Sequence, residues 1–137
     1  MFRTSIGRKL VVAVSGALLV GFLVVHASGN LLILKGADAL NAYADWLQGH
    51  PLLWAFRAGL ALLLLVHVVT ALRLARENRA ARPLRYQRIA RLGARLPGRL
   101  MALSGLVLLA FIVFHLLHLT VHAVGPVAEP LRDAAGR

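Results

Sequence analysis

Three long apolar runs dominate the chain, and charged residues are almost absent from them. The runs are Leu10–Leu34, Leu52–Leu72 and Leu100–Val124. Each has the roughly 20 helical residues that are needed to cross about 30 Å of hydrocarbon. The pattern therefore predicts an all-α, multi-pass transmembrane helical bundle with three spans. We expect residues 1–137 to form a single transmembrane anchor domain.

The segment that joins the first two runs, residues 36–51, has a helical pattern of its own. Its apolar residues recur at helical spacing, as Leu40, Tyr43 and Leu47. Asp38 is a candidate N-cap, and Gly49 followed by Pro51 is a typical helix stop. The segment predicts a short helix that lies in the membrane interface.

The charge distribution gives the direction of the spans. The net charge of +11 would admit nucleic-acid binding. The arginines are instead gathered beside the spans, nine of them in Arg73–Arg99 against the single acid Glu77. Such clusters stay in the cytoplasm, which predicts a cytoplasmic N-terminus, an outside C-terminus and a place in the inner (cytoplasmic) membrane. Membrane lipid is thus the expected partner, and nucleic acid is not. A rough apolar stripe in this segment predicts a basic helix on the inner surface: Leu84, Ile89, Leu92 and Leu96.

Five histidines lie in the predicted spans, where an ionisable residue is by default a functional hypothesis. They are His26, His67, His115, His118 and His122. At 1.5 Å per residue, His26 and His115 lie roughly 24 and 22 Å from the inner ends of their spans. His67 lies roughly 8 Å from the inner end of its span. The count therefore predicts an outer pair and one inner histidine.

An internal repeat relates the first and third spans. SGALLVGFLVVH ends at His26 and SGLVLLAFIVFH ends at His115, with six of twelve positions identical. In each copy the histidine shares a helix face with the Phe four residues earlier and with the Ser-Gly pair. The glycines, Gly16 and Gly105, lie about 15 Å inward of the histidines, close to the depth of His67. They predict room for a large flat group.

These features favour haem. Neutral imidazole is a good axial ligand for haem iron, and two facing helices can supply two of them. We expect His26 and His115 to ligate at the outer level and His67 to serve the inner level. The repeat favours His115 over His118, which we expect to hydrogen-bond near the haem propionates. Asn30, one turn after His26, is a candidate hydrogen-bond partner.

Two other interpretations compete with haem. The histidines could simply bond carbonyls across helices, as polar residues in membrane proteins do. A zinc site is disfavoured because no carboxylate or cysteine joins the pair. The chain has no cysteine, so it supplies no iron–sulfur ligand of its own.

Four segments resemble the cytochrome b558 membrane anchor of succinate dehydrogenase. They are SIGRKLVVAVSGALLVGFLVVHASGNLL, GADALNAYADWL, LLLLVHVVTALRL and SGLVLLAFIVFHLLHLT, which together cover about Ser5 to Val121. The resemblance implies haem b ligation by His26, His67 and His115. It also implies flavoprotein and iron–sulfur partner subunits, with electrons passing from succinate through haem b to a quinone in respiratory electron transport and the tricarboxylic acid cycle.

Within such an enzyme the chain would be the non-flavin membrane subunit, with no catalytic acid or base of its own. Members of this family continue into two further spans, the last with a fourth histidine. His67 is also about 15 Å or more from every other span histidine along the membrane normal, so no second histidine of this chain can complete a site with it. We therefore expect this chain alone to bind at most one six-coordinate haem. The quinone is expected near the inner ends of the spans, where Ser5, Arg8 and Ser15 supply polar groups. Alternative functions are a fumarate reductase anchor, another b-type respiratory or ferric-reductase cytochrome, and a helical membrane protein without a cofactor.

Overall fold

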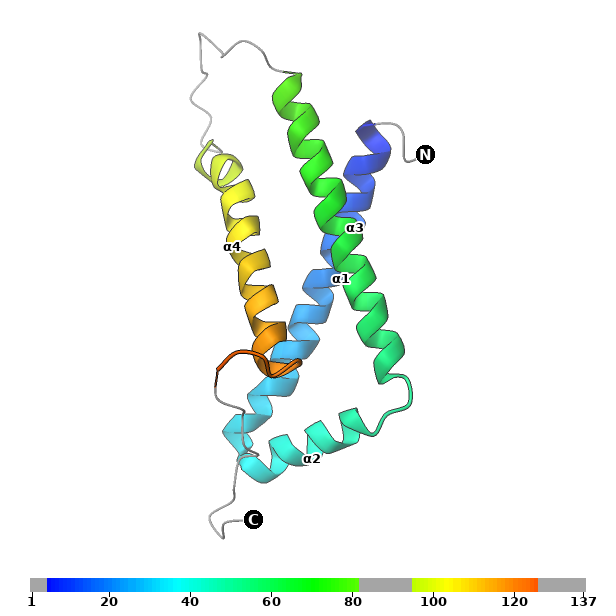
Figure 1. Cartoon of the computed structure of the whole chain (residues 1–137), viewed down its shortest axis with the longest axis vertical. Coiled ribbons are helices and arrows are strands. Elements are labelled where there is room, and N and C mark those ends of the chain that lie inside the picture. The colour runs from blue at the N-terminus through cyan, green and yellow to red at the C-terminus, as the bar shows by residue number, and fades with distance from the viewer. Residues whose placement is uncertain (1–4, 82–94, 126–137) are drawn as a thin grey trace. The chain divides into compact units, whose positions relative to one another are not determined.

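A computed structural model describes residues 5–81 and 95–125, with side chains from Leu100 onward in the second range. These residues form helices and short turns and contain no strand. The elements in order are α1 (Ser5–Asn30), the 3-10 helix η1 (Leu31–Lys35), α2 (Ala37–Gln48), α3 (Leu53–Ala80) and α4 (Arg95–Leu119), all shown in Figure 1.

Three helical segments are long and apolar enough to cross a membrane. Their mean hydropathies are 2.4, 2.1 and 2.6, for Ser5–Lys35, Leu53–Ala80 and Leu100–Leu119 respectively. Among the described residues no apolar side chain is buried, as expected when the solvent for these helices is lipid rather than water. The predicted all-α class with three membrane-crossing helices is confirmed.

Two helices are longer than the apolar runs that predicted them. α1 begins at Ser5 rather than Leu10, and α3 continues to Ala80 rather than ending at Leu72. The residues added to α3 are mostly arginine and alanine, which are strong helix formers. Hydropathy marks where a helix leaves the hydrocarbon, not where its backbone hydrogen bonding stops. The start of the arginine-rich segment is therefore helical.

The predicted basic surface helix falls largely outside the described residues. Leu84, Ile89 and Leu92 lie in the stretch between 81 and 95, and Leu96 belongs to the first turn of α4. That expectation stays a prediction.

α4 ends at Leu119, five residues before the predicted end of the third span, so that boundary was wrong. The Leu116 carbonyl accepts hydrogen bonds from the amides of Thr120 and Val121, at 3.0 and 2.9 Å. The backbone then turns through His122, whose φ of 56° is left-handed. Helices usually end this way at Gly or Asn, so the sequence carries no obvious signal for a stop here.

The N-cap of α2 lies two residues before the one that the sequence suggested. Gly36, with a φ of 113°, is the N-cap, and Asp38 lies in the first turn of the helix. The prediction of Asp38 as N-cap is therefore wrong. A glycine adopts this backbone conformation without steric cost, and an aspartate in the first turn still stabilises the helix dipole. The end of α2 is as predicted, with Gly49 as its C-cap.

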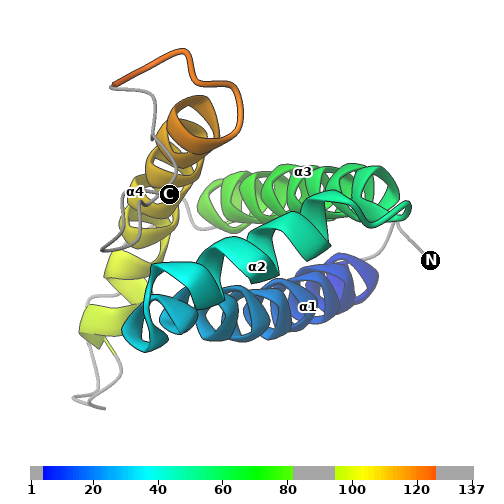
Figure 2. The same cartoon turned by 90° about the horizontal axis from the view of Figure 1, so that it is seen from below.

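The helices α1, α2 and α3 form one compact unit together with η1. α1 and α3 run antiparallel and side by side, and α2 lies across the end of the pair (Figures 1 and 2). Near the start of α1, Arg8 forms an ion pair with Glu77 of α3 at 2.8 Å. Near the end of α1, Tyr43 of α2 packs over Gly29. α4 and the turn after it belong to a second compact unit.

Candidate functional site

Two of the candidate residues meet between α1 and α3. Ser15 is 3% exposed and is the only buried residue in the described part of the chain. Its hydroxyl donates to the Val11 carbonyl at 2.6 Å, with the Val12 carbonyl farther away at 3.3 Å. The same Oγ lies 2.9 Å from Nδ1 of His67. One serine thus connects the backbone of α1 to an imidazole of α3.

Gly16 lies directly under the same imidazole. A Cβ built on Gly16 would lie 3.2 Å from Cε1 and 3.7 Å from Nδ1 of His67. Gly16 and His67 therefore lie at the same level of the α1–α3 pair, as residue counting predicted. The space above this glycine is filled by the imidazole itself, and a larger residue would push the ring off α1.

His67 uses one ring nitrogen in this site. Its Nδ1 pairs with Ser15, and Nε2 has no hydrogen-bond partner within the described ranges. A ligating histidine typically has this arrangement, because one nitrogen is fixed by a neighbour while the other meets the metal.

His26 lies on the face of α1 that also carries Ser15. Its ring stacks on Phe22, with centroids 5.3 Å apart and an interplanar angle of 24°. Nδ2 of Asn30 donates to the His26 carbonyl at 2.9 Å and lies 3.3 Å from Nε2 of His26. Asn30 is thus the neighbour that the sequence suggested. It contacts Nε2, so ligation through that nitrogen requires the amide to turn away.

The corresponding pair on α4 has similar geometry. His115 stacks on Phe111 at 5.7 Å and 28°, as the repeat predicted from the shared helix face. His118 is different: its ring is tilted against Phe114 at 42°, and a Cβ on Gly125 would lie 3.1 Å from its Nε2. The turn after α4 therefore packs over His118.

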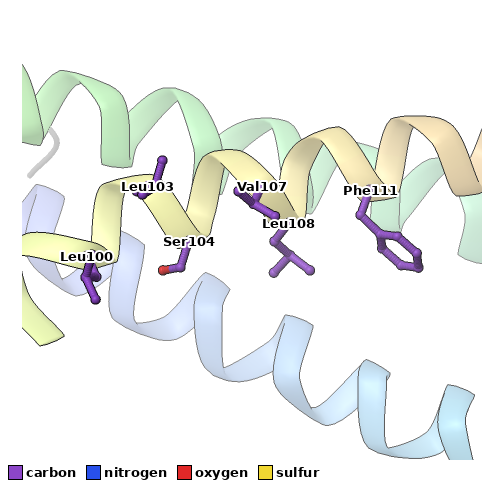
Figure 3. Close-up of a pocket in the computed structure, with 6 residues that line it drawn as sticks. All are labelled: Leu100, Leu103, Ser104, Val107, Leu108 and Phe111. Atoms are coloured by element: carbon purple, nitrogen blue, oxygen red, sulfur yellow. The ribbon is translucent and has the colours of Figure 1, made fainter.

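One face of α4 carries a shallow apolar hollow, shown in Figure 3. Its lining includes Leu100, Ser104 and Phe111, which recur at helical spacing. His115 follows Phe111 one turn later on the same side of the helix. The Ser104 hydroxyl donates to the Met101 carbonyl at 3.1 Å. The remaining lining residues are Leu103, Val107 and Leu108. Gly105 follows Ser104, and a Cβ built on it would meet no described atom within 4 Å.

Among the described residues no three His, Asp or Glu side chains gather as they would around zinc. Haem needs single imidazoles and apolar helix faces, and both are present on α1, α3 and α4. His26 and His115 belong to different units, so their pairing stays a prediction, as do the roles of His67 and His118.

Sequence reasoning missed the bond between Ser15 and His67. It considered Ser15 only as a polar group for quinone, although the Ser-Gly pair had been placed near the depth of His67. His122 lies in the turn after α4, outside the helix.

Comparison with known proteins adds no relative: no family model, no curated protein and no solved structure matches the chain.

Proposed function

We propose that this chain is the haem b-containing membrane anchor subunit of a succinate dehydrogenase, which passes electrons from an iron–sulfur subunit to quinone. One observation carries the proposal. His67, inside a membrane-crossing helix, is held through Nδ1 by the only buried residue of the described chain and keeps Nε2 free of hydrogen bonds to the described residues.

This arrangement suits an axial ligand more fully than a structural histidine. A histidine that only joins two helices needs one hydrogen bond, which Ser15 provides. An uncharged Nε2 without a partner in an apolar region has an unsatisfied lone pair, which is unfavourable. Binding iron through that lone pair satisfies it.

At the outer level of the proposed site, the haem ligands come from the two repeated segments of α1 and α4. His26 and His115 supply one imidazole each, and Phe22 and Phe111 restrict the rotation of those rings by stacking on them. Haem bound there would supply a one-electron carrier within the membrane. The apolar end of the α4 hollow nearest His115, at Leu108 and Phe111, would lie against the ring system and exclude water from it.

The proposed topology puts the soluble partners on the arginine-rich side. Arg8 and Lys9 in α1 and the arginines of the segment 73–99 lie on the cytoplasmic side in this scheme. A flavoprotein and an iron–sulfur subunit would dock there, and quinone would approach the same ends of the spans.

Co-purification tests the proposal. The tagged chain, extracted from its native membranes in mild detergent, should carry a covalent-flavin or flavin-binding polypeptide and an iron–sulfur polypeptide. Succinate should reduce the b-type haem in that preparation. A haem-bearing chain that is isolated without either polypeptide, or whose haem succinate does not reduce, would contradict the proposal and favour another b-type cytochrome.

A further inference from the structure

The hydrogen bonds around Ser15 determine where the proton of His67 lies. A serine hydroxyl has a single proton, and at 2.6 Å that proton is committed to the Val11 carbonyl. The 2.9 Å contact between Oγ and Nδ1 then has only one possible donor, the imidazole. Neutral His67 is therefore the tautomer with the proton on Nδ1 and the lone pair on Nε2. The other tautomer would place two lone pairs against each other.

The packing around the ring fixes its orientation as well. Ser15 is 3% exposed, so no solvent molecule replaces it as acceptor. Gly16 lets the Cε1 edge of the ring approach α1, because a Cβ built at that position would lie only 3.2 Å from Cε1. The Nδ1 edge is thus held against α1, and Nε2, on the opposite side of the ring from Cγ and Nδ1, is the atom left to bind.

We infer that Ser15 is a positioning residue: it holds His67 as the Nδ1–H tautomer and so presents the Nε2 lone pair as a metal-ligating atom. The inference rests on the proposed function for the identity of the metal group, haem iron. Because Ser15 also donates to the Val11 carbonyl, the imidazole, hydroxyl and carbonyl form a short chain of bonds that strengthen one another. Donation from Nδ1–H raises the basicity of the ligating nitrogen.

The first test reads the tautomer in the full chain without haem. Two-bond ¹H–¹⁵N correlation of ¹⁵N-histidine-labelled chain in detergent, above the pH range in which imidazole titrates, distinguishes protonated from unprotonated ring nitrogens. The signals of His67 are those lost in His67→Gln. The wild type should carry the proton on Nδ1. Ser15→Ala should move most of the population to Nε2–H, and Ser15→Thr should retain Nδ1–H. The control is Ser28→Ala, because the Ser28 hydroxyl also donates to a carbonyl one turn earlier in α1, at 2.8 Å; it should leave His67 unchanged.

Wild-type His67 with its proton on Nε2, or an unchanged tautomer in Ser15→Ala, would overturn the positioning role. If only the positioning role is wrong, the wild-type chain isolated from its membranes should still contain haem. Absence of haem from wild-type chain isolated from its membranes, together with the expected tautomers, would instead overturn the proposed function alone.

The second test measures the midpoint potential of the haem iron. In the intact complex, Ser15→Ala should raise the midpoint potential of one haem, because a less basic imidazole stabilises ferric iron less. Ser28→Ala should not shift that potential. If Ser15→Ala shifts the tautomer but leaves every haem potential unchanged, His67 does not ligate iron, and the ligand assignment is overturned.

Discussion

Replacement of Gly29 by alanine tests the contact that attaches α2 to α1. A Cβ at this position would lie 2.9 Å from Cε1, 3.0 Å from Oη and 3.1 Å from Cζ of Tyr43. Three atoms of the Tyr43 side chain, two of them in the ring, would thus be closer than ordinary van der Waals contact. The Tyr43 ring must move, and it also stacks on Trp46 with centroids 6.1 Å apart. The substitution should therefore loosen α2 from the rest of its unit.

The magnitude follows from two opposing terms. Overpacking typically costs about 1–3 kcal/mol. Replacing a helical glycine by alanine returns about 0.8–1 kcal/mol through backbone entropy. Gly21→Ala is the matched control, because Gly21 lies in the same helix and a Cβ there meets no described atom within 4 Å. Gly21→Ala should be neutral or slightly stabilising, and Gly29→Ala should be less stable than it by about 1–3 kcal/mol.

Unfolding by sodium dodecyl sulfate in mixed micelles, followed by far-ultraviolet circular dichroism, measures the difference. Trp46 fluorescence should change in Gly29→Ala and not in Gly21→Ala, since that indole stacks on the displaced ring. In a Tyr43→Ala background the penalty should vanish, which gives a coupling of about 1–3 kcal/mol. Equal stabilities of the two glycine variants, or a penalty that persists without Tyr43, would refute this packing.

Two further predictions concern the histidines of α4 and the ion pair. His115→Ala should abolish the low-spin b-type spectrum, whereas His118→Ala should largely preserve it, since the His118 ring packs against Gly125 in the turn after α4. Reduced-minus-oxidised spectra of membranes decide this, and a normal low-spin spectrum in His115→Ala would reject the assignment. For Arg8 and Glu77, whose side chains are 24% and 45% exposed, a double-mutant cycle should give a coupling of about 0–1 kcal/mol that falls with added salt. A coupling above roughly 2 kcal/mol, unaffected by salt, would contradict a solvent-screened pair.

The sequence predicted the features that depend on position along a helix. Apolar length gave the three crossing helices, and residue counting brought Gly16 to the level of His67. The i, i+4 spacing gave the stacks of His26 on Phe22 and His115 on Phe111. Each of these follows from helix geometry alone.

Features that depend on rotation between helices or on local backbone competition were not predictable. Counting gives height but not which face of α3 meets α1, so the bond from His67 to Ser15 was missed. Asp38 and Gly36 are both acceptable caps, and the backbone at Gly36 decided between them. The left-handed His122 that follows α4 has no sequence signal of its own.

The number of haems per polypeptide tests the account most directly. Purified full chain, assayed by pyridine haemochrome against protein concentration, should contain one haem b, low-spin and lost in both His26→Ala and His115→Ala. The His67 site should stay without a six-coordinate haem in the isolated chain, because residue counting places no other span histidine at its level. A chain that is folded but binds no haem, or one that holds two low-spin haems as an isolated monomer, would contradict the account.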